Sequence, residues 1–249
     1  MYLRIMTAMI VTAILKVWFG EIYPVDLLKE EIHGVASYLE VLGALYGIIL
    51  AFIIFVVWDQ FNKVQTGIYL EGNAIEDLYH TASFVSDSVA VHQMKFLIRE
   101  YLETTIADEK SFLARGESCL AATNAFLKIS DSVRAVEIKT QKDQVVFTGL
   151  LDALVRVNNL RDARLGISSA RIPITLWYLI YFYSVAIIAG FFFLGIKISF
   201  LSVTVTSVIA GAIFFLLNVI ADIDNPFDGT WNISYEPFSL ALVRLKTQR

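Results

Sequence analysis

Three stretches of this sequence contain no aspartate, glutamate, lysine or arginine: residues 41–57, 172–196 and 198–221. They are 17, 25 and 24 residues long, and only Lys197 separates the last two. About 20 apolar residues cross the hydrocarbon core of a bilayer, which is about 30 Å thick. Three such runs are not expected in a soluble domain of this length. They also lack the alternation of apolar and polar residues that is typical of barrel strands. They therefore predict membrane-spanning helices.

Cysteine and histidine are also scarce, and the net charge is negative. Cys119 is the only cysteine, so an internal disulfide is excluded, and the three histidines show no metal-site spacing. The formal net charge of −4 leaves no basic footprint for nucleic acid. The sequence contains no nucleophile elbow, phosphate loop or pair of membrane carboxylates, so we do not expect an enzyme.

The N-terminal residues predict a fourth span. Residues 1–19 are apolar except for Arg4 and Lys16, whose stem can reach the headgroups from near the end of the run. A signal peptide is the alternative, but no small-x-small cleavage site precedes a polar stretch, and the Trp18-Phe19 pair suits an interfacial anchor. The expected spans lie near residues 3–19, 39–58, 172–195 and 199–221.

Lysine and arginine are distributed unevenly around these spans. The loop 20–38 has one lysine against four acidic residues, and the turn between the last two spans has only Lys197. The opposite side carries Arg4, Lys63, Arg156, Arg161, Arg164, Arg171, Arg244, Lys246 and Arg249. The positive-inside rule therefore predicts a multi-pass protein of the inner (plasma) membrane, in contact with lipid, with both termini in the cytoplasm.

The segment between the second and third spans has the features of a helical bundle. It contains no proline, and from Phe61 to Val85 its apolar residues lie three, four or seven positions apart. The second span is therefore predicted to continue as one long amphipathic helix. Further helices are expected around residues 94–102, 120–129 and 145–165, with breaks near Gly116 and Ser130–Lys142.

The expected fold is all-α, an integral membrane protein with four transmembrane helices and a helical cytoplasmic bundle. Its predicted parts are residues 1–58 with the first two transmembrane helices, 59–171 as the cytoplasmic helical region, 172–221 with the last two transmembrane helices, and 222–249 as a cytoplasmic tail.

A dense polar motif follows the last predicted span. Asp222, Asp224 and Asp228 lie within seven positions, beside turn-forming Asn-Pro and Asp-Gly pairs. Three carboxylates at this spacing are typical of a loop for a hard cation, but Ile233 occupies the position of the glutamate that closes an EF-hand. Two interpretations stay open: a solvated, turn-rich helix exit, or a loop that binds a cation or clasps a helix.

Small residues recur at every fourth position of the second span, at Gly43, Gly47 and Ala51. This spacing lets helix backbones approach closely. It predicts either ordinary helix packing or contacts in a closed ring of identical chains around a pore. Glu40, at the outer end of the span, is then either a carboxylate among headgroups or a ring charge at a pore mouth.

Two short motifs point to a known family. Trp58-Asp59-Gln60-Phe61 resembles the Trp-Asn-Gln-Tyr that ends the pore helix of bestrophins, and Asp224-Asn225-Pro226-Phe227 resembles the Asn-Pro-Phe-Gly turn after their last membrane helix. A closer resemblance is to the bestrophin-like domain family of largely bacterial membrane proteins. Its motifs are matched further by Glu71, Asn73, Asp77, Arg161, Arg164, Trp177, Gly229, Pro237 and Phe238.

The resemblance implies an oligomeric ion channel, pentameric in bestrophins, whose second helix lines a hydrophobic neck. Alignment with bestrophins puts the neck positions at Glu40, Ala44 and Ile48. Bestrophin necks carry bulky apolar residues, whereas these three positions hold an acidic, a small and a branched residue. An acidic ring at Glu40 would favour cations. The calcium-clasp acids of animal bestrophins are represented only by the three aspartates after the last span, so Ca²⁺ is the only cofactor implied.

Two functions follow from the sequence. The first is a homo-oligomeric bestrophin-like ion channel, with other copies of the chain and inorganic ions as its partners and the second transmembrane helix lining the pore. The alternative is a membrane-anchored scaffold or sensor whose region 59–171 binds a cytoplasmic partner. The two differ in whether the second helix faces an axial water path or faces lipid and protein.

Overall fold

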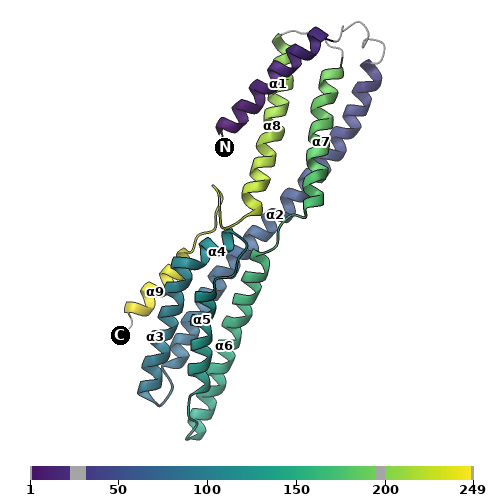
Figure 1. The fold of residues 1–249 in the computed structure, drawn as a ribbon. Helices are drawn as coiled ribbons and strands as arrows, with labels where there is room; N and C mark the ends of the chain where they lie inside the picture. The colour runs from purple at the N-terminus through teal and green to yellow at the C-terminus, as the bar shows by residue number, and fades with distance from the viewer. Residues whose placement is uncertain (1, 23–31, 195–199, 248–249) are drawn as a thin grey trace. The chain divides into compact units, whose positions relative to one another are not determined.

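The computed structural model describes residues 2–22, 32–194 and 200–247, and over these ranges the chain forms helices and no strand (Figure 1). The all-α prediction is therefore confirmed. The elements are α1 (Tyr2–Ile22), α2 (Ile32–Ala82), α3 (Ser88–Thr104), the π-helical turn η2 (Thr105–Glu109), α4 (Lys110–Ala114), α5 (Leu120–Arg134), α6 (Gln141–Ser168), α7 (Ile174–Phe193), α8 (Phe200–Asp224) and α9 (Glu236–Thr247).

The chain divides into two compact units. The first unit comprises Met1–Trp58 and Arg171–Asp224, and the second comprises Asp59–Ala170 and Asn225–Arg249. Helix α2 contributes to both, because it continues without interruption from Ile32 to Ala82. This continuation confirms the long helix that the apolar spacing after Phe61 predicts.

Four of the described helices are long and apolar enough to cross a membrane: α1, α2, α7 and α8. They correspond to the four predicted spans. Helix α8 extends to Asp224, three residues beyond the predicted end of its span at 221. Helix α7 begins after Pro173, a residue that is tolerated at a helix start because the first backbone N–H groups there have no helical acceptor.

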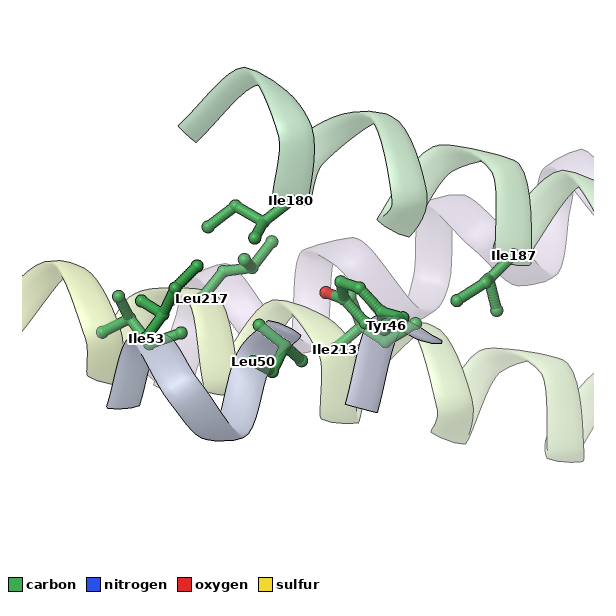
Figure 2. Close-up of a cluster of buried hydrophobic side chains, with 8 residues drawn as sticks. Tyr46, Leu50, Ile53, Ile180, Ile187, Ile213 and Leu217 are labelled. Carbon is green, nitrogen blue, oxygen red and sulfur yellow. The ribbon is translucent and has the colours of Figure 1, made fainter. Parts of the chain in front are cut away.

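An apolar core joins three of these helices (Figure 2). Tyr46, Leu50 and Ile53 recur at intervals of four and three residues, so they share one face of α2. They pack with the following side chains of α7 and α8: Ile180, Ile187, Ile213, Leu217 and Ile220. One polar contact lies in this core. The hydroxyls of Tyr46 and Ser184 are 2.7 Å apart. Tyr46 is the donor, since Ser184 donates to the carbonyl oxygen of Ile180 at 2.6 Å.

Helix α1 packs against α8 and α7. A Cβ atom added at Gly211 would lie 2.6 Å from Cγ of Met9, so the absence of a side chain there allows the two helices to approach. Lys16 is 7% exposed, and its Nζ donates to the carbonyl oxygen of Phe191 at 2.7 Å. The ammonium is accepted by one of the carbonyls in the last turn of α7, which have no helical donor. That Lys16 reaches the headgroups stays a prediction.

In the second unit, side chains cap the helices that follow α2. Asp87 accepts the N–H groups of Val89 and Ala90 at the start of α3. Thr140 and Asp143 form a capping box at the start of α6. Gly116, after α4, has a φ of +74°, which favours glycine, so the break predicted there is confirmed.

The second predicted break is shorter than expected. Helix α5 runs to Arg134 rather than ending near Ser130, because Ile129 and Val133 extend its buried face by another turn. The break between α5 and α6 is therefore limited to the residues between Arg134 and Gln141. The chain therefore leaves α5 and enters α6 through a short connection that the capping box closes.

Candidate functional site

Helix α2 carries an apolar face that the rest of the chain leaves exposed. Val41, Leu45, Ile48, Phe52 and Phe55 are between 45% and 70% exposed and lie three or four positions apart. Each residue of an α-helix turns by about 100°, so Ile48 and Phe55 lie about half a turn away from the side chains of the apolar core. The two faces of α2 are therefore both apolar, but only one of them is used inside the chain.

The predicted pore residues lie on this exposed face. Glu40, Ala44 and Ile48 are all exposed, with Ile48 at 68%. Successive members are separated by four residues, or about 6 Å along the helix axis. Because each four-residue step turns the side chain by about 40°, the three side chains form a slanted row that reaches the side of α2 opposite its intramolecular contacts at Ile48.

The predicted packing residues are exposed as well. Gly43, Gly47 and Ala51 all fall in the exposed class, and a Cβ atom at Gly43 or Gly47 would meet nothing within 4 Å. In contrast, a Cβ atom at Gly190 would overlap the side chain of Leu39. Packing inside the chain therefore explains Gly190 and leaves the spacing of Gly43, Gly47 and Ala51 unexplained.

Two of the three aspartates after the last span accept hydrogen bonds from backbone N–H groups. Among the described residues, no three His, Cys, Asp or Glu side chains are arranged so that they could hold a metal ion. Asp224 accepts the N–H of Ile172 at 2.9 Å, and Asp228 accepts the N–H of Gly229 at 2.8 Å. Asp224 therefore links the end of α8 to the residues just before α7, and Asp228 stabilises a local turn. The role of Asp222, Asp224 and Asp228 in binding Ca²⁺ stays a prediction.

The second unit contains a fully buried ionic cluster. Arg164 of α6 donates from Nε to Oε2 of Glu71 at 2.6 Å and from Nη2 to Oε1 of Glu71 at 3.3 Å. Its Nη1 donates to Oε2 of Glu109 at 2.5 Å. The hydroxyl of Tyr101 donates to Oε1 of Glu71 at 2.7 Å. None of these four side chains is more than 1% exposed, so each depends on the others for its hydrogen bonds.

Distant motif residues meet at this cluster. The guanidinium carbon of Arg164 lies 5.5 Å from the centre of the Phe238 ring. A Cβ atom at Gly72 would lie 3.5 Å from the carbonyl oxygen of Pro237, so the Pro237-Phe238 pair packs against α2 beside Glu71. Of the residues that carry the family resemblance, Glu71, Arg164 and Phe238 are therefore brought together.

Other residues from those motifs make different contacts. Asp77 is exposed and pairs with Arg156 at 3.4 Å. Arg161 donates to the hydroxyl of Thr123 at 2.8 Å. Trp177 belongs to the first unit. Gly229 has a φ of +86°, so the turn it occupies favours glycine.

The environment of the cluster fixes its protonation. Burial disfavours the charged guanidinium, but Glu71 and Glu109 outweigh that effect and raise the pKa of Arg164 well above its ordinary value. Burial, reinforced by the charge of Glu71, likewise raises the pKa of Tyr101 well above its ordinary value. At physiological pH, Arg164 is charged and Tyr101 is a hydrogen-bond donor.

The turn η2 explains how Glu109 reaches the cluster. Tyr101, Thr105 and Glu109 are spaced by four residues and are all buried. In an α-helix each such step rotates the side chain by about 40°, so Glu109 would turn away from the position of Tyr101. A π-helical turn accommodates one more residue per turn and cancels this rotation. Sequence periodicity gave no signal for Glu109, whereas Tyr101 belongs to the apolar stripe that predicts α3.

The comparisons with known proteins agree with the motifs. The model of the Bestrophin-like domain family matches residues 7–238. The chain belongs to the bestrophin-like domain family. The resemblance that the sequence motifs indicate is thereby confirmed.

Solved structures share the fold of this bestrophin-like chain. A crystal structure of a bacterial bestrophin homologue from Klebsiella pneumoniae has a TM-score of 0.69 at 10% identity, over 96% of this chain and 99% of that one. A crystal structure of a point-mutated membrane protein has a TM-score of 0.74 at 9% identity, over 98% of both chains. No curated protein matches the chain.

Proposed function

We propose that this chain is the subunit of a homo-oligomeric ion channel in which α2 lines the pore. The observation that carries the proposal is the apolar face of α2 that lies opposite the intramolecular core, with Ile48 and Phe55 at its centre. Membership of the bestrophin-like family supports the same function. The ring would contain five copies by analogy with bestrophins.

The exposed small residues support assembly around α2. In lipid, helices associate through close packing rather than through burial of apolar surface, so small residues at four-residue spacing favour contacts between helices. Gly43, Gly47 and Ala51 meet this condition and are not used inside the chain. Contacts between different surfaces of identical chains must close into a ring or extend without limit, and a ring with α2 at its centre encloses an axis.

The chemistry along the exposed face of α2 suits a conduction path. Glu40 would form an acidic ring that favours cations, and Ile48 would form an apolar constriction able to gate by dewetting. Beyond Trp58 the same side of the helix becomes polar, with Asn62 and Thr66 exposed. An apolar neck would thus be followed by a hydrated wall.

Imaging of the purified protein tests this arrangement. Particles in mild detergent, viewed along their symmetry axis, are expected to form rings with a central opening lined by α2. Rings whose centre is closed, with α2 facing lipid, would instead favour the membrane-anchored scaffold or sensor.

A further inference from the structure

A groove in the second unit gathers basic and hydroxyl side chains. It has a volume of about 670 Å³, which lies within the range of small-molecule sites, about 300–1,000 Å³. The end of α2, the connection that follows it and the first three turns of α3 form its walls. Its polar lining includes Ser83, Ser86, Ser88, His92, Lys95 and Arg99.

Four of these side chains form one row on α3. Ser88, His92, Lys95 and Arg99 follow at intervals of four, three and four residues. At about 100° per residue they all lie within about 60° of one another around the helix. The row extends for about 16 Å along the axis, and Lys95 and Arg99 are about 6 Å apart at one end of it.

The two cations of this row have no carboxylate partner among the described residues. Both are only partly exposed. The ammonium of Lys95 lies 4.7 Å from the centre of the Tyr79 ring. Arg99 donates from Nε to the carbonyl oxygen of Lys95 at 3.3 Å. That bond leaves the Nη groups of Arg99 as donors for a ligand.

The acidic residues around the groove are already engaged. On α3, Glu100 pairs with Lys128 at 2.7 Å and Glu103 pairs with Lys246 at 2.6 Å. Asp87 accepts the first N–H groups of the helix. The positive charge at Lys95 and Arg99 is therefore not neutralised by its neighbours.

Asp143, in the first turn of α6, is engaged as well. It accepts the hydroxyl of Ser86 at 2.5 Å and the hydroxyl of Thr140 at 2.9 Å. Ser88, by contrast, makes no hydrogen bond through its hydroxyl within the described part of the chain, so it can donate to a ligand. The groove thus offers a hydroxyl donor and two cationic donors on one helix face.

We propose that this groove binds a small phosphate-bearing anion, held mainly by Lys95 and Arg99. A phosphate group presents three acceptor oxygens, so it can accept a bidentate pair of hydrogen bonds from a guanidinium and a further bond from an ammonium. The volume of the groove and the length of the row accommodate more than one phosphate group. The phosphate can belong to a soluble compound or to a lipid headgroup.

Calorimetry on the full-length protein in detergent tests the proposal, with inorganic pyrophosphate as the soluble probe and a short-chain phosphatidylinositol 4-phosphate as the lipid probe. The wild type is expected to bind at least one probe, less tightly as salt concentration rises. The double variant Lys95→Gln/Arg99→Gln is expected to bind about tenfold more weakly or worse, the change that a loss of about 1.4 kcal/mol produces. Tighter binding of the lipid probe assigns the phosphate to a headgroup, and tighter binding of pyrophosphate assigns it to a soluble compound.

The matched control is Arg156→Gln, which removes one exposed cation that does not line the groove. This variant is expected to bind the probes like the wild type. Failure of both probes to bind the wild type at millimolar concentration would overturn the proposal, as would unchanged binding by the double variant. If the double variant does not fold, hydrogen exchange of the wild type decides. Pyrophosphate or the lipid probe must then protect residues 83–99, and equal exchange with and without both probes refutes the site.

Discussion

Arg164 holds both carboxylate oxygens of Glu71 in a fork, with Nε at 2.6 Å from Oε2 and Nη2 at 3.3 Å from Oε1, and neither side chain is exposed. The two residues are 93 positions apart, on α6 and α2. Because a buried charge without its partner is costly, this pair ties the correct pairing of the two helices to the folding of the second unit.

Replacing Arg164 should therefore destabilise the second unit severely. Arg164→Met leaves Glu71 and Glu109 buried without a cation, and the free energy of unfolding should fall by about 3–5 kcal/mol. Denaturant unfolding in detergent measures this loss. Arg156→Met is the control, since its exposed pair with Asp77 contributes about 0–1 kcal/mol. Equal effects of the two substitutions would show that the buried cluster does not hold the unit together.

The start of α6 should weaken in acid. Hydrogen bonds from Ser86 and then Thr140 lower the pKa of Asp143. A carboxyl group whose pKa is lower in the folded state stabilises the fold above its unfolded pKa, and that stability is lost as the pH falls through the folded pKa. Wild type should thus lose stability relative to Asp143→Asn below about pH 4, the unfolded value. Thermal unfolding of both proteins from pH 7 to pH 3 measures the difference, and parallel curves would contradict it.

Much of the fold is encoded in local patterns that the sequence displays. The uncharged runs predict α2, α7 and α8, and the apolar spacing after Phe61 predicts that α2 continues beyond its membrane span. The buried cluster was only partly predictable. Glu71 and Arg164 lie in the family motifs, but Glu109 reaches them through a π-helical turn that breaks the 3.6-residue periodicity. Likewise, no local pattern relates Lys16 to the carbonyl oxygen of Phe191, 175 residues away.

Assembly should depend on the small residues of α2. Gly47→Leu adds a side chain where the chain itself has room, since a Cβ atom there meets nothing within 4 Å. The single chain should fold as before, whereas the contacts between chains should be lost. Sedimentation in mild detergent should show a homo-oligomer for the wild type and smaller species for Gly47→Leu. Gly34→Leu, at a position of α2 that is equally open, should sediment like the wild type. A monomeric wild type would rule out the ring.

Ion selectivity should respond to the charge at Glu40. If this exposed carboxylate forms a ring at the pore mouth, Glu40→Gln removes its attraction for cations. The cation-to-anion permeability ratio, obtained from reversal potentials across a salt gradient in a bilayer, should shift towards anions. Glu76→Gln serves as the control, because Glu76 pairs with Arg244 in the second unit. A ratio that Glu40→Gln leaves unchanged would place Glu40 among headgroups rather than at the pore.

Ion flux into vesicles containing the purified protein tests whether α2 lines a pore. Wild-type vesicles should pass ions faster than empty ones, and Ile48→Ala should raise the flux further because it widens an apolar constriction. Ile14→Ala removes the same atoms from an exposed position of α1 (62% exposed, against 68% for Ile48) and should leave the flux at the wild-type level. Flux equal to that of empty vesicles for all three proteins would contradict the channel and leave the scaffold or sensor in its place.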